Sequence, residues 1–142
     1  MIELPIIPGG MLIALLMATT TVPAQPAAGH ASHAFTISPG DRFTEQTGEA
    51  LYNASCAGCH MPDGKGAEGA GRYPALAGNP AVGAAPYVIN NVLHGRKGMP
   101  SFGDAMNDEQ VAAVVNYTRT HFGNRFPETV TPSQVKGLRE AQ

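Results

Sequence analysis

Residues 56–60 read Cys-Ala-Gly-Cys-His and contain both cysteines of the chain, so any chemistry of the thiols takes place at this one point. Two thiols three positions apart can each add across one of the two vinyl groups of haem. A histidine directly after the second thiol can then bind the haem iron. The motif predicts one covalently bound haem c, attached through Cys56 and Cys59, with His60 as an iron ligand. The rest of the chain would have to fold around this group.

A CxxC pair also occurs in zinc sites and in thiol–disulfide exchange, and both alternatives fit this sequence poorly. A thioredoxin-like pair is expected near a βαβ pattern, which we do not find, and it does not need His60. A zinc ribbon needs four ligands, usually from two such pairs. The remaining histidines are scattered rather than paired at ligand spacing: His30, His33, His94 and His121.

The composition agrees with a large cofactor inside a single small domain. The 142 residues include 17 Gly, 12 Pro and no Trp, and aromatic residues make up only 6%. The chain is therefore rich in loops and short of large core side chains, a gap that an apolar cofactor would fill. A balance of 9 basic to 11 acidic residues lacks the basic excess of a nucleic-acid-binding protein.

The N-terminal part has the pattern of an export signal. Residues 11–18 form an apolar block that is too short to cross a bilayer as a helix. We predict a signal peptide over residues 1–24 and a periplasmic location. Because Glu3 is the only charge among the first ten residues, where Lys or Arg is usual, an uncleaved anchor is the alternative. We predict a flexible linker over residues 25–40, the haem domain over 41–125 and a C-terminal extension over 126–142.

Hydrophobic spacing and capping residues predict helices and no strands, hence an all-α fold. The strongest helix is capped by Asn107, with Gln110 completing a capping box. No stretch alternates apolar and polar residues for long enough to indicate a strand. Residues 61–86 are rich in Gly and Pro and are expected to form a long loop. The predicted helices cover residues 47–54, 86–93, 108–122 and 132–139.

A second iron ligand has to come from a later segment, and Met99 is the best candidate. It lies between Gly98 and Pro100 in a loop whose glycines allow the backbone to approach a porphyrin closely. A thioether is a soft ligand that favours reduced iron. The competing candidates are Met61, which adjoins His60, and Met106, His94 and His121.

With a helix, the CxxCH motif, a Gly-Met-Pro loop and a C-terminal helix in this order, residues 45–123 resemble the small His/Met c-type cytochromes of class I. The resemblance implies a small cytochrome c fold of three to five helices around one haem c, with His60 and Met99 as axial ligands. It also implies that the first and last helices cross, so that Gly48 and Tyr52 meet Val114 and Tyr117.

Residues 73–78 look like the family's stretch in which a proline carbonyl accepts a hydrogen bond from the ligand imidazole. The resemblance therefore implies that Pro74 is the partner of His60. Spacing does not choose among the candidates for binding the haem propionates, which are Arg72, Tyr73, Asn79 and Arg96.

More narrowly, residues 90–95, 111–124 and 130–136 are similar to single-haem units in the cytochrome subunits of bacterial periplasmic dehydrogenases. Those subunits often carry three haems, whereas this chain has one CxxCH motif. The resemblance implies an electron carrier, because two axial ligands leave no vacancy on the iron for a substrate. The expected partners are a dehydrogenase as donor and an oxidase or another cytochrome as acceptor, with membrane association only through a partner or an uncleaved N-terminus. Lys65, Arg72, Arg96 and Lys97 are candidates for guiding docking.

Overall fold

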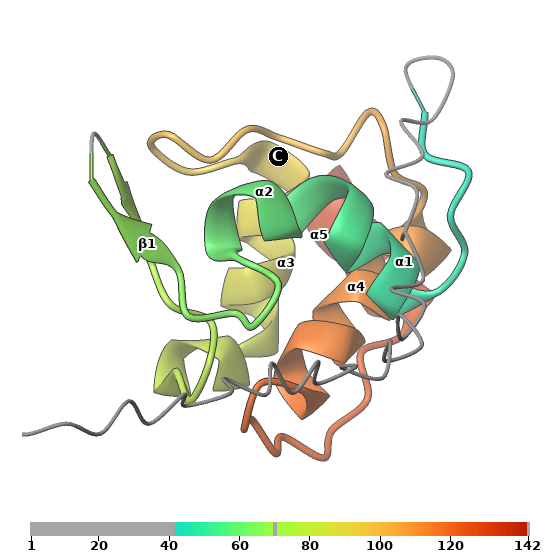
Figure 1. The fold of residues 1–142 in the computed structure, drawn as a ribbon. Coiled ribbons are helices and arrows are strands. Elements are labelled where there is room, and N and C mark those ends of the chain that lie inside the picture. Colours follow the sequence, from blue (N-terminus) through green and yellow to red (C-terminus); the bar gives the residue numbers. More distant parts are fainter. Residues whose placement is uncertain (1–41, 70, 142) are drawn as a thin grey trace, which may run out of the picture. The chain divides into compact units, whose positions relative to one another are not determined.

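The computed structural model describes residues 42–69 and 71–141, which form several helices joined by long loops and one small sheet (Figure 1). The predicted signal peptide and linker, residues 1–24 and 25–40, lie outside the described residues. Within the described ranges, no helix has both the length and the apolar character needed to cross a membrane.

The first helical run extends from Gly48 to His60 and carries the whole CxxCH motif at its end. It consists of α1 (Gly48–Leu51), the π-helical turn η1 (Tyr52–Cys56) and α2 (Ala57–His60). The side chain of Thr47 accepts a hydrogen bond from the Ala50 amide and caps the N-terminus of this run. The run continues past the predicted end at residue 54, and the motif therefore lies on helix rather than after it.

The longest helix, α4 (Asp108–Thr120), crosses α1 at a glycine. The predicted capping box is present, since Asn107 accepts from the Gln110 amide while the Gln110 side chain accepts from the Asn107 amide. A Cβ at Gly48 would collide with the Ala113 carbonyl and lie 2.7 Å from the Cβ of Tyr117. The two helices approach this closely because Gly48 has no side chain.

Two further helices complete the helical part. The helix α3 (Ala85–His94) ends at Gly95, whose φ of 72° is a conformation that glycine tolerates. The helix α5 (Pro132–Glu140) lies in the predicted C-terminal extension, and Thr131 and Gln134 form its capping box. It contacts α3 and α4, and Val135 is fully buried at the contact.

The expectation that the chain contains no strand is wrong at one hairpin. Strands β1 (Ala67–Glu68) and β2 (Arg72–Tyr73) pair antiparallel, with Ala67 opposite Tyr73. Two-residue strands are too short to show alternation, so the sequence pattern could not reveal them. A 3₁₀ turn, η2 (Pro80–Gly83), follows in the same long loop. The fold remains mostly helical, as predicted.

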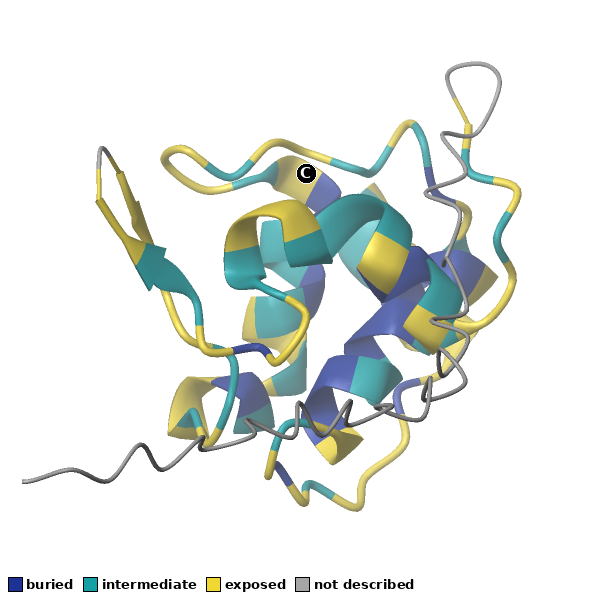
Figure 2. Cartoon of the chain, in the orientation of Figure 1, coloured by how far each residue is buried: buried dark blue, intermediate teal, exposed yellow. Residues whose placement is uncertain are grey.

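The core lies between α1, α3, α4 and α5, and the hairpin lies outside it. Figure 2 shows the buried positions gathered on α4 and on the sides of α1 and α3 that turn toward it, while the hairpin is largely exposed. The predicted contact of the first and last helices is confirmed, since the rings of Tyr52 and Tyr117 pack with centroids 5.6 Å apart. The fully buried aliphatic core residues are Leu51, Ile89, Val111, Val114, Val115 and Val135.

Candidate functional site

The π-helical turn η1 sets the direction of the CxxCH motif. The amide of Ala57 donates to the carbonyl of Tyr52, five residues back, so this turn contains one residue more than an α-helical turn. The carbonyl of Leu51 instead accepts from the hydroxyl of Ser55 at 2.6 Å. Single π turns of this kind are frequent at functional sites. Here the turn ends at Cys56 and rotates the following residues relative to α1.

The two thiols of the motif are free and differ in exposure. Cys56 is half-buried at the end of η1, and Cys59 is exposed on α2. Burial raises the pKa of the Cys56 thiol to about 11, the side-chain contact with Ser55 acts in the opposite direction, and nearby Cys59 adds a smaller increase. In the absence of a covalent partner, the Cys56 thiol therefore stays protonated at neutral pH.

The imidazole of His60 is oriented by a hydrogen bond on one of its two nitrogens. Its Nδ1 lies 2.9 Å from the carbonyl oxygen of Pro74, the residue that the resemblance implied. A carbonyl oxygen only accepts, so Nδ1 must carry the proton and donate it. In the neutral imidazole the other nitrogen, Nε2, then keeps its lone pair, which is the state that binds a metal ion.

The segment after Pro74 is held by main-chain and side-chain hydrogen bonds. The amides of Leu76 and Ala77 both donate to the carbonyl of Gly64, at 2.7 and 2.9 Å. Asn124, which is 4% exposed, donates to the Leu76 carbonyl at 2.9 Å and accepts from the Asn79 amide at 3.2 Å. The sequence analysis missed Asn124, whose only signal was its place directly after the last helix of the predicted domain.

Tyr52 connects the first helical run to the residue after His60. Its hydroxyl donates to the carbonyl of Met61 at 2.7 Å, and the side chain is fully buried. Burial is the main reason that the pKa of Tyr52 is raised, so the hydroxyl remains a donor. The ring packs on Phe122 with centroids 4.8 Å apart. Tyr52 thereby ties the turn after His60 to the end of α4.

Met99 lies half-buried in the loop between α3 and α4, against the edge of the core. Its amide and carbonyl both pair with the main chain of Arg96, each at 3.0 Å. Of the competing ligand candidates, Met106 is 2% exposed and belongs to the core. His94 and His121 are exposed at the ends of α3 and α4, and His121 has its Nδ1 3.0 Å from the carbonyl of Tyr117.

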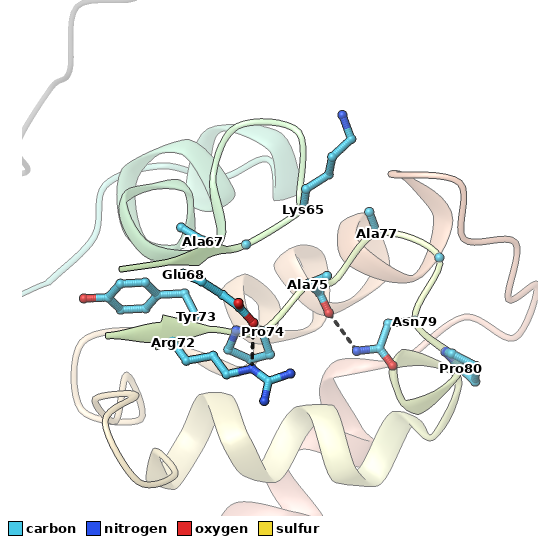
Figure 3. A pocket seen from close by; sticks show the side chains of 12 residues that line it. Lys65, Ala67, Glu68, Arg72, Tyr73, Pro74, Ala75, Ala77, Asn79 and Pro80 are labelled. Carbon is cyan, nitrogen blue, oxygen red and sulfur yellow. Dashed lines mark hydrogen bonds and ion pairs between the residues drawn. The ribbon is translucent and has the colours of Figure 1, made fainter. Parts of the chain in front are cut away.

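A cavity of about 620 Å³ lies beside the hairpin, next to the carbonyl that orients His60 (Figure 3). Its lining includes Pro74, together with three of the predicted propionate candidates, Arg72, Tyr73 and Asn79. The fourth candidate, Arg96, is not in this lining and donates to the Tyr87 hydroxyl at 3.0 Å. The motif residues and Met99 do not line this cavity. The cavity is therefore adjacent to the candidate site and not part of it.

Acidic neighbours partly neutralise two of the four basic residues that were expected to guide docking. Lys65 pairs with Asp63 at 2.9 Å, and this contact lowers the pKa of the Asp63 carboxyl. Arg72 pairs with Glu68 at 3.2 Å, as Figure 3 shows. Both pairs are exposed to solvent, where such contacts contribute little to stability.

The donor set at the motif fits haem c better than a metal ion bound by side chains alone. Haem requires two free thiols, an imidazole with a free Nε2 and one further ligand, and the described residues supply each of these. In the ranges that the structure describes, no three residues of the types His, Cys, Asp and Glu come together in a way that could hold a metal ion.

Comparisons with known proteins give a consistent result. A family described as cytochrome C oxidase, cbb3-type, subunit III, matches residues 44–117. The fructose dehydrogenase cytochrome subunit of Gluconobacter japonicus is 38% identical over 107 residues, which are 65% of this chain and 22% of that protein. The gluconate 2-dehydrogenase cytochrome c subunit of Pantoea cypripedii is also 38% identical over 107 residues, covering 67% of this chain and 24% of the relative. Cytochrome c-552 of Thermus thermophilus is 33% identical over 127 residues, which cover 75% of this chain and 83% of that protein.

Proposed function

Because the chain belongs to the cytochrome c family described as cytochrome C oxidase, cbb3-type, subunit III, we propose that it relays single electrons from a periplasmic dehydrogenase to an oxidase or another cytochrome. Its relatives are cytochrome c subunits and a cytochrome c-552, so the chain is an electron-transfer protein with covalently bound haem c. The donor, the acceptor and the periplasmic location are parts of the proposal.

The haem-binding residues are proposed from the motif and from the surroundings of His60. Cys56 and Cys59 form the thioether bonds, and His60 and Met99 bind the iron. The observation that carries this assignment is the hydrogen bond of 2.9 Å between His60 Nδ1 and the Pro74 carbonyl. It leaves Nε2 as the free nitrogen of a histidine that directly follows the two thiols.

When bound, haem c supplies an iron that gains and loses one electron reversibly. The residues of the chain have three tasks beside it. The Pro74 carbonyl holds the proton at Nδ1 of His60, which fixes the tautomer and makes the imidazole a better ligand. Met99 adds a soft thioether that favours the reduced state. Together, His60 and Met99 would hold the iron and would keep oxygen, peroxide and substrates from binding to it.

A dehydrogenase is the proposed donor because two of the relatives are named as cytochrome subunits of dehydrogenases. This chain spans 22% and 24% of their lengths. It corresponds in length to the shorter cytochrome c-552, of which the match covers 83%. A unit of this size can serve as a separate carrier or as one part of a larger complex, and in both cases it passes on one electron at a time.

The proposal is tested by replacing Met99 and measuring azide binding to the ferric holoprotein. In Met99→Ala one axial position becomes available, so we expect azide to bind at least about tenfold more tightly than to the wild type, a difference of about 1.4 kcal/mol. Met61→Leu is the matched control. Met61 directly follows His60 and cannot reach the opposite side of the iron, so its replacement should leave azide binding unchanged.

Azide binding to the wild type as tight as to Met99→Ala would contradict the carrier assignment. That result would favour a five-coordinate haem with peroxidase-like or gas-binding chemistry. A spectrum of the denatured protein, oxidised and then reduced, checks the thioether bonds separately, because covalently attached haem remains with the unfolded chain.

A further inference from the structure

The last helix reaches back to the loop that follows Met99. Near the C-terminal end of α5, the guanidinium of Arg139 contacts three groups of that loop and of the start of α4. Nη1 donates to the carbonyl of Gly103, Nη2 donates to the carbonyl of Met106 at 3.0 Å, and Nε donates to Asp108 at 2.8 Å. Figure 1 shows the C-terminal end of the chain beside this loop.

These contacts are partly shielded from water. The side chains of Arg139 and Asp108 are 30% and 24% exposed. Hydrogen bonds that involve a charged group contribute more than neutral ones, and partial burial reduces their screening. An arginine whose planar donors meet two carbonyls and a carboxylate holds its partners in one geometry.

The helix that carries Arg139 is itself firmly placed. Val135 of α5 is fully buried, and Leu138 packs against the core. Thr131 and Gln134 cap the first turn of the helix. A side chain on such a helix can fix the position of a loop, because its own backbone has little freedom to follow the loop.

Gly103 is held from two sides at the point where Arg139 binds it. Its amide donates to the carbonyl of Leu93 at 3.1 Å, and its carbonyl accepts from Arg139. A Cβ at this position would lie 2.6 Å from the Leu93 carbonyl oxygen and 3.3 Å from Nη1 of Arg139. The close approach of the loop to α3 and α5 therefore requires glycine here.

We propose that Arg139 is a positioning residue for Met99. This inference rests on the proposed function, in which Met99 is the second iron ligand. The loop that presents Met99 is fixed before this residue by the main-chain pair with Arg96, and after it by Arg139. Without Arg139, residues 100–107 lose their charged attachment to α5, and Met99 spends less time in the position that binds iron.

A purely structural role for Arg139 is the competing explanation. Phe102 and Met106 also anchor the loop, because both belong to or pack against the core. If those contacts suffice, removing Arg139 lowers the stability of the whole domain and leaves the ligand loop unchanged. The test therefore has to separate local opening of the loop from global unfolding.

The experiment compares ferric holoproteins of the wild type, Arg139→Gln and Arg139→Lys. Lys136→Gln is the matched control, because it removes one positive charge from the same helix. In the part of the chain that the structure describes, Lys136 makes an exposed ion pair with Glu140 at 3.8 Å and does not contact the loop after Met99. Three quantities are measured: azide affinity, the sulfur-to-iron charge-transfer absorption, and amide hydrogen exchange over residues 99–107 relative to α4.

For Arg139→Gln we expect azide affinity to rise about tenfold or more, the sulfur-to-iron absorption to weaken, and the loop amides to exchange faster than those of α4. Arg139→Lys keeps the positive charge but loses the planar guanidinium with its several donors. Its values in all three measurements should therefore lie between those of Arg139→Gln and the wild type. Lys136→Gln should match the wild type in all three measurements.

The inference is overturned if Arg139→Gln is folded and retains wild-type azide affinity and loop exchange. If Arg139→Gln does not fold, Arg139→Lys decides. Wild-type azide affinity in that variant together with a lower unfolding temperature means that Arg139 is only structural. Failure of the proposed function gives a different result, because the wild type would then bind azide as tightly as Met99→Ala does.

Discussion

At the scale of single residues, the site depends on which nitrogen of His60 carries a proton. The Pro74 carbonyl settles this, and it can do so only while the backbone of residues 74–79 stays in place. Asn124 is the side chain that ties this backbone to α4, through the Leu76 carbonyl, the Asn79 amide and the Thr118 carbonyl. The orientation of the His60 imidazole thus depends on a residue 64 positions further along the chain.

We expect Asn124→Ala to destabilise the protein by about 2–4 kcal/mol, because it leaves several buried hydrogen-bonding groups of the main chain without their partner. Urea unfolding of the holoprotein measures the change. Asn53→Ala, at an exposed position of the first helical run, is the control and should change the unfolding free energy by less than about 0.5 kcal/mol. Equal effects of the two substitutions would show that Asn124 does not anchor the segment.

Long-range contacts such as these mark the limit of what the sequence can reveal about the site. The CxxCH motif can be recognised from the sequence because its reactive groups lie within five consecutive residues. Asn124 and Arg139 act on partners more than 30 positions away, and nothing in their local sequence indicates those partners. Such residues become visible only when the fold brings the segments together.

At the scale of secondary structure, the crossing of α1 and α4 brings the start of the first helical run against the last helix of the predicted haem domain. The crossing depends on Gly48, whose missing side chain leaves room for the Ala113 carbonyl and Tyr117. Since the first helical run continues from α1 to His60, a change in this crossing also moves the motif.

Gly48→Ala is expected to lower the unfolding free energy by about 1–3 kcal/mol, because the added methyl group overpacks the crossing. This loss should outweigh the gain of up to about 1 kcal/mol that alanine gives a helix over glycine. Gly137→Ala in α5 is the control, since a Cβ there meets nothing within 4 Å and should stabilise the helix. Thermal unfolding followed by circular dichroism measures both. A Gly48→Ala protein more stable than the wild type would contradict the close crossing.

The helices were predicted well where their signals are local. The capping boxes of α4 and α5 each lie within four residues, and the box that we predicted for α4 is present. The π turn and the hairpin were missed for a physical reason. In the π turn, the hydroxyl of Ser55 donates to the Leu51 carbonyl in place of a main-chain amide. The strands of the hairpin are only two residues long. Neither feature changes the hydrophobic pattern of the sequence enough to be predicted from it.

At the scale of the whole molecule, the described core is small for the length of chain that surrounds it. It consists mostly of valine, leucine and isoleucine, with Tyr52 as its fully buried aromatic residue. Long segments, such as residues 95–107, contain little regular structure. Burial of the haem would add to the apolar contacts that this core makes by itself.

We expect a variant with Cys56→Ala and Cys59→Ala, which cannot form thioether bonds, to unfold on the order of 10 °C or more below the wild-type holoprotein. The physical reason is that the cofactor binds to the folded state and not to the unfolded state, and so stabilises the folded state. Calorimetry measures the unfolding temperature of each protein. The unsubstituted chain produced without haem attachment is the control for effects of the substitutions themselves. Equal unfolding temperatures for all three proteins would mean that the fold is independent of its cofactor.

The two residues that hold the segments around His60 and Met99 stand late in the chain. Asn124 reaches back 48 positions to the Leu76 carbonyl, and Arg139 reaches back 36 positions to the Gly103 carbonyl. Removing α5 would therefore remove the contacts of Arg139 with the loop after Met99, whereas the hydrogen bonds of Asn124 would keep their partners. The two segments can thus be loosened independently of each other.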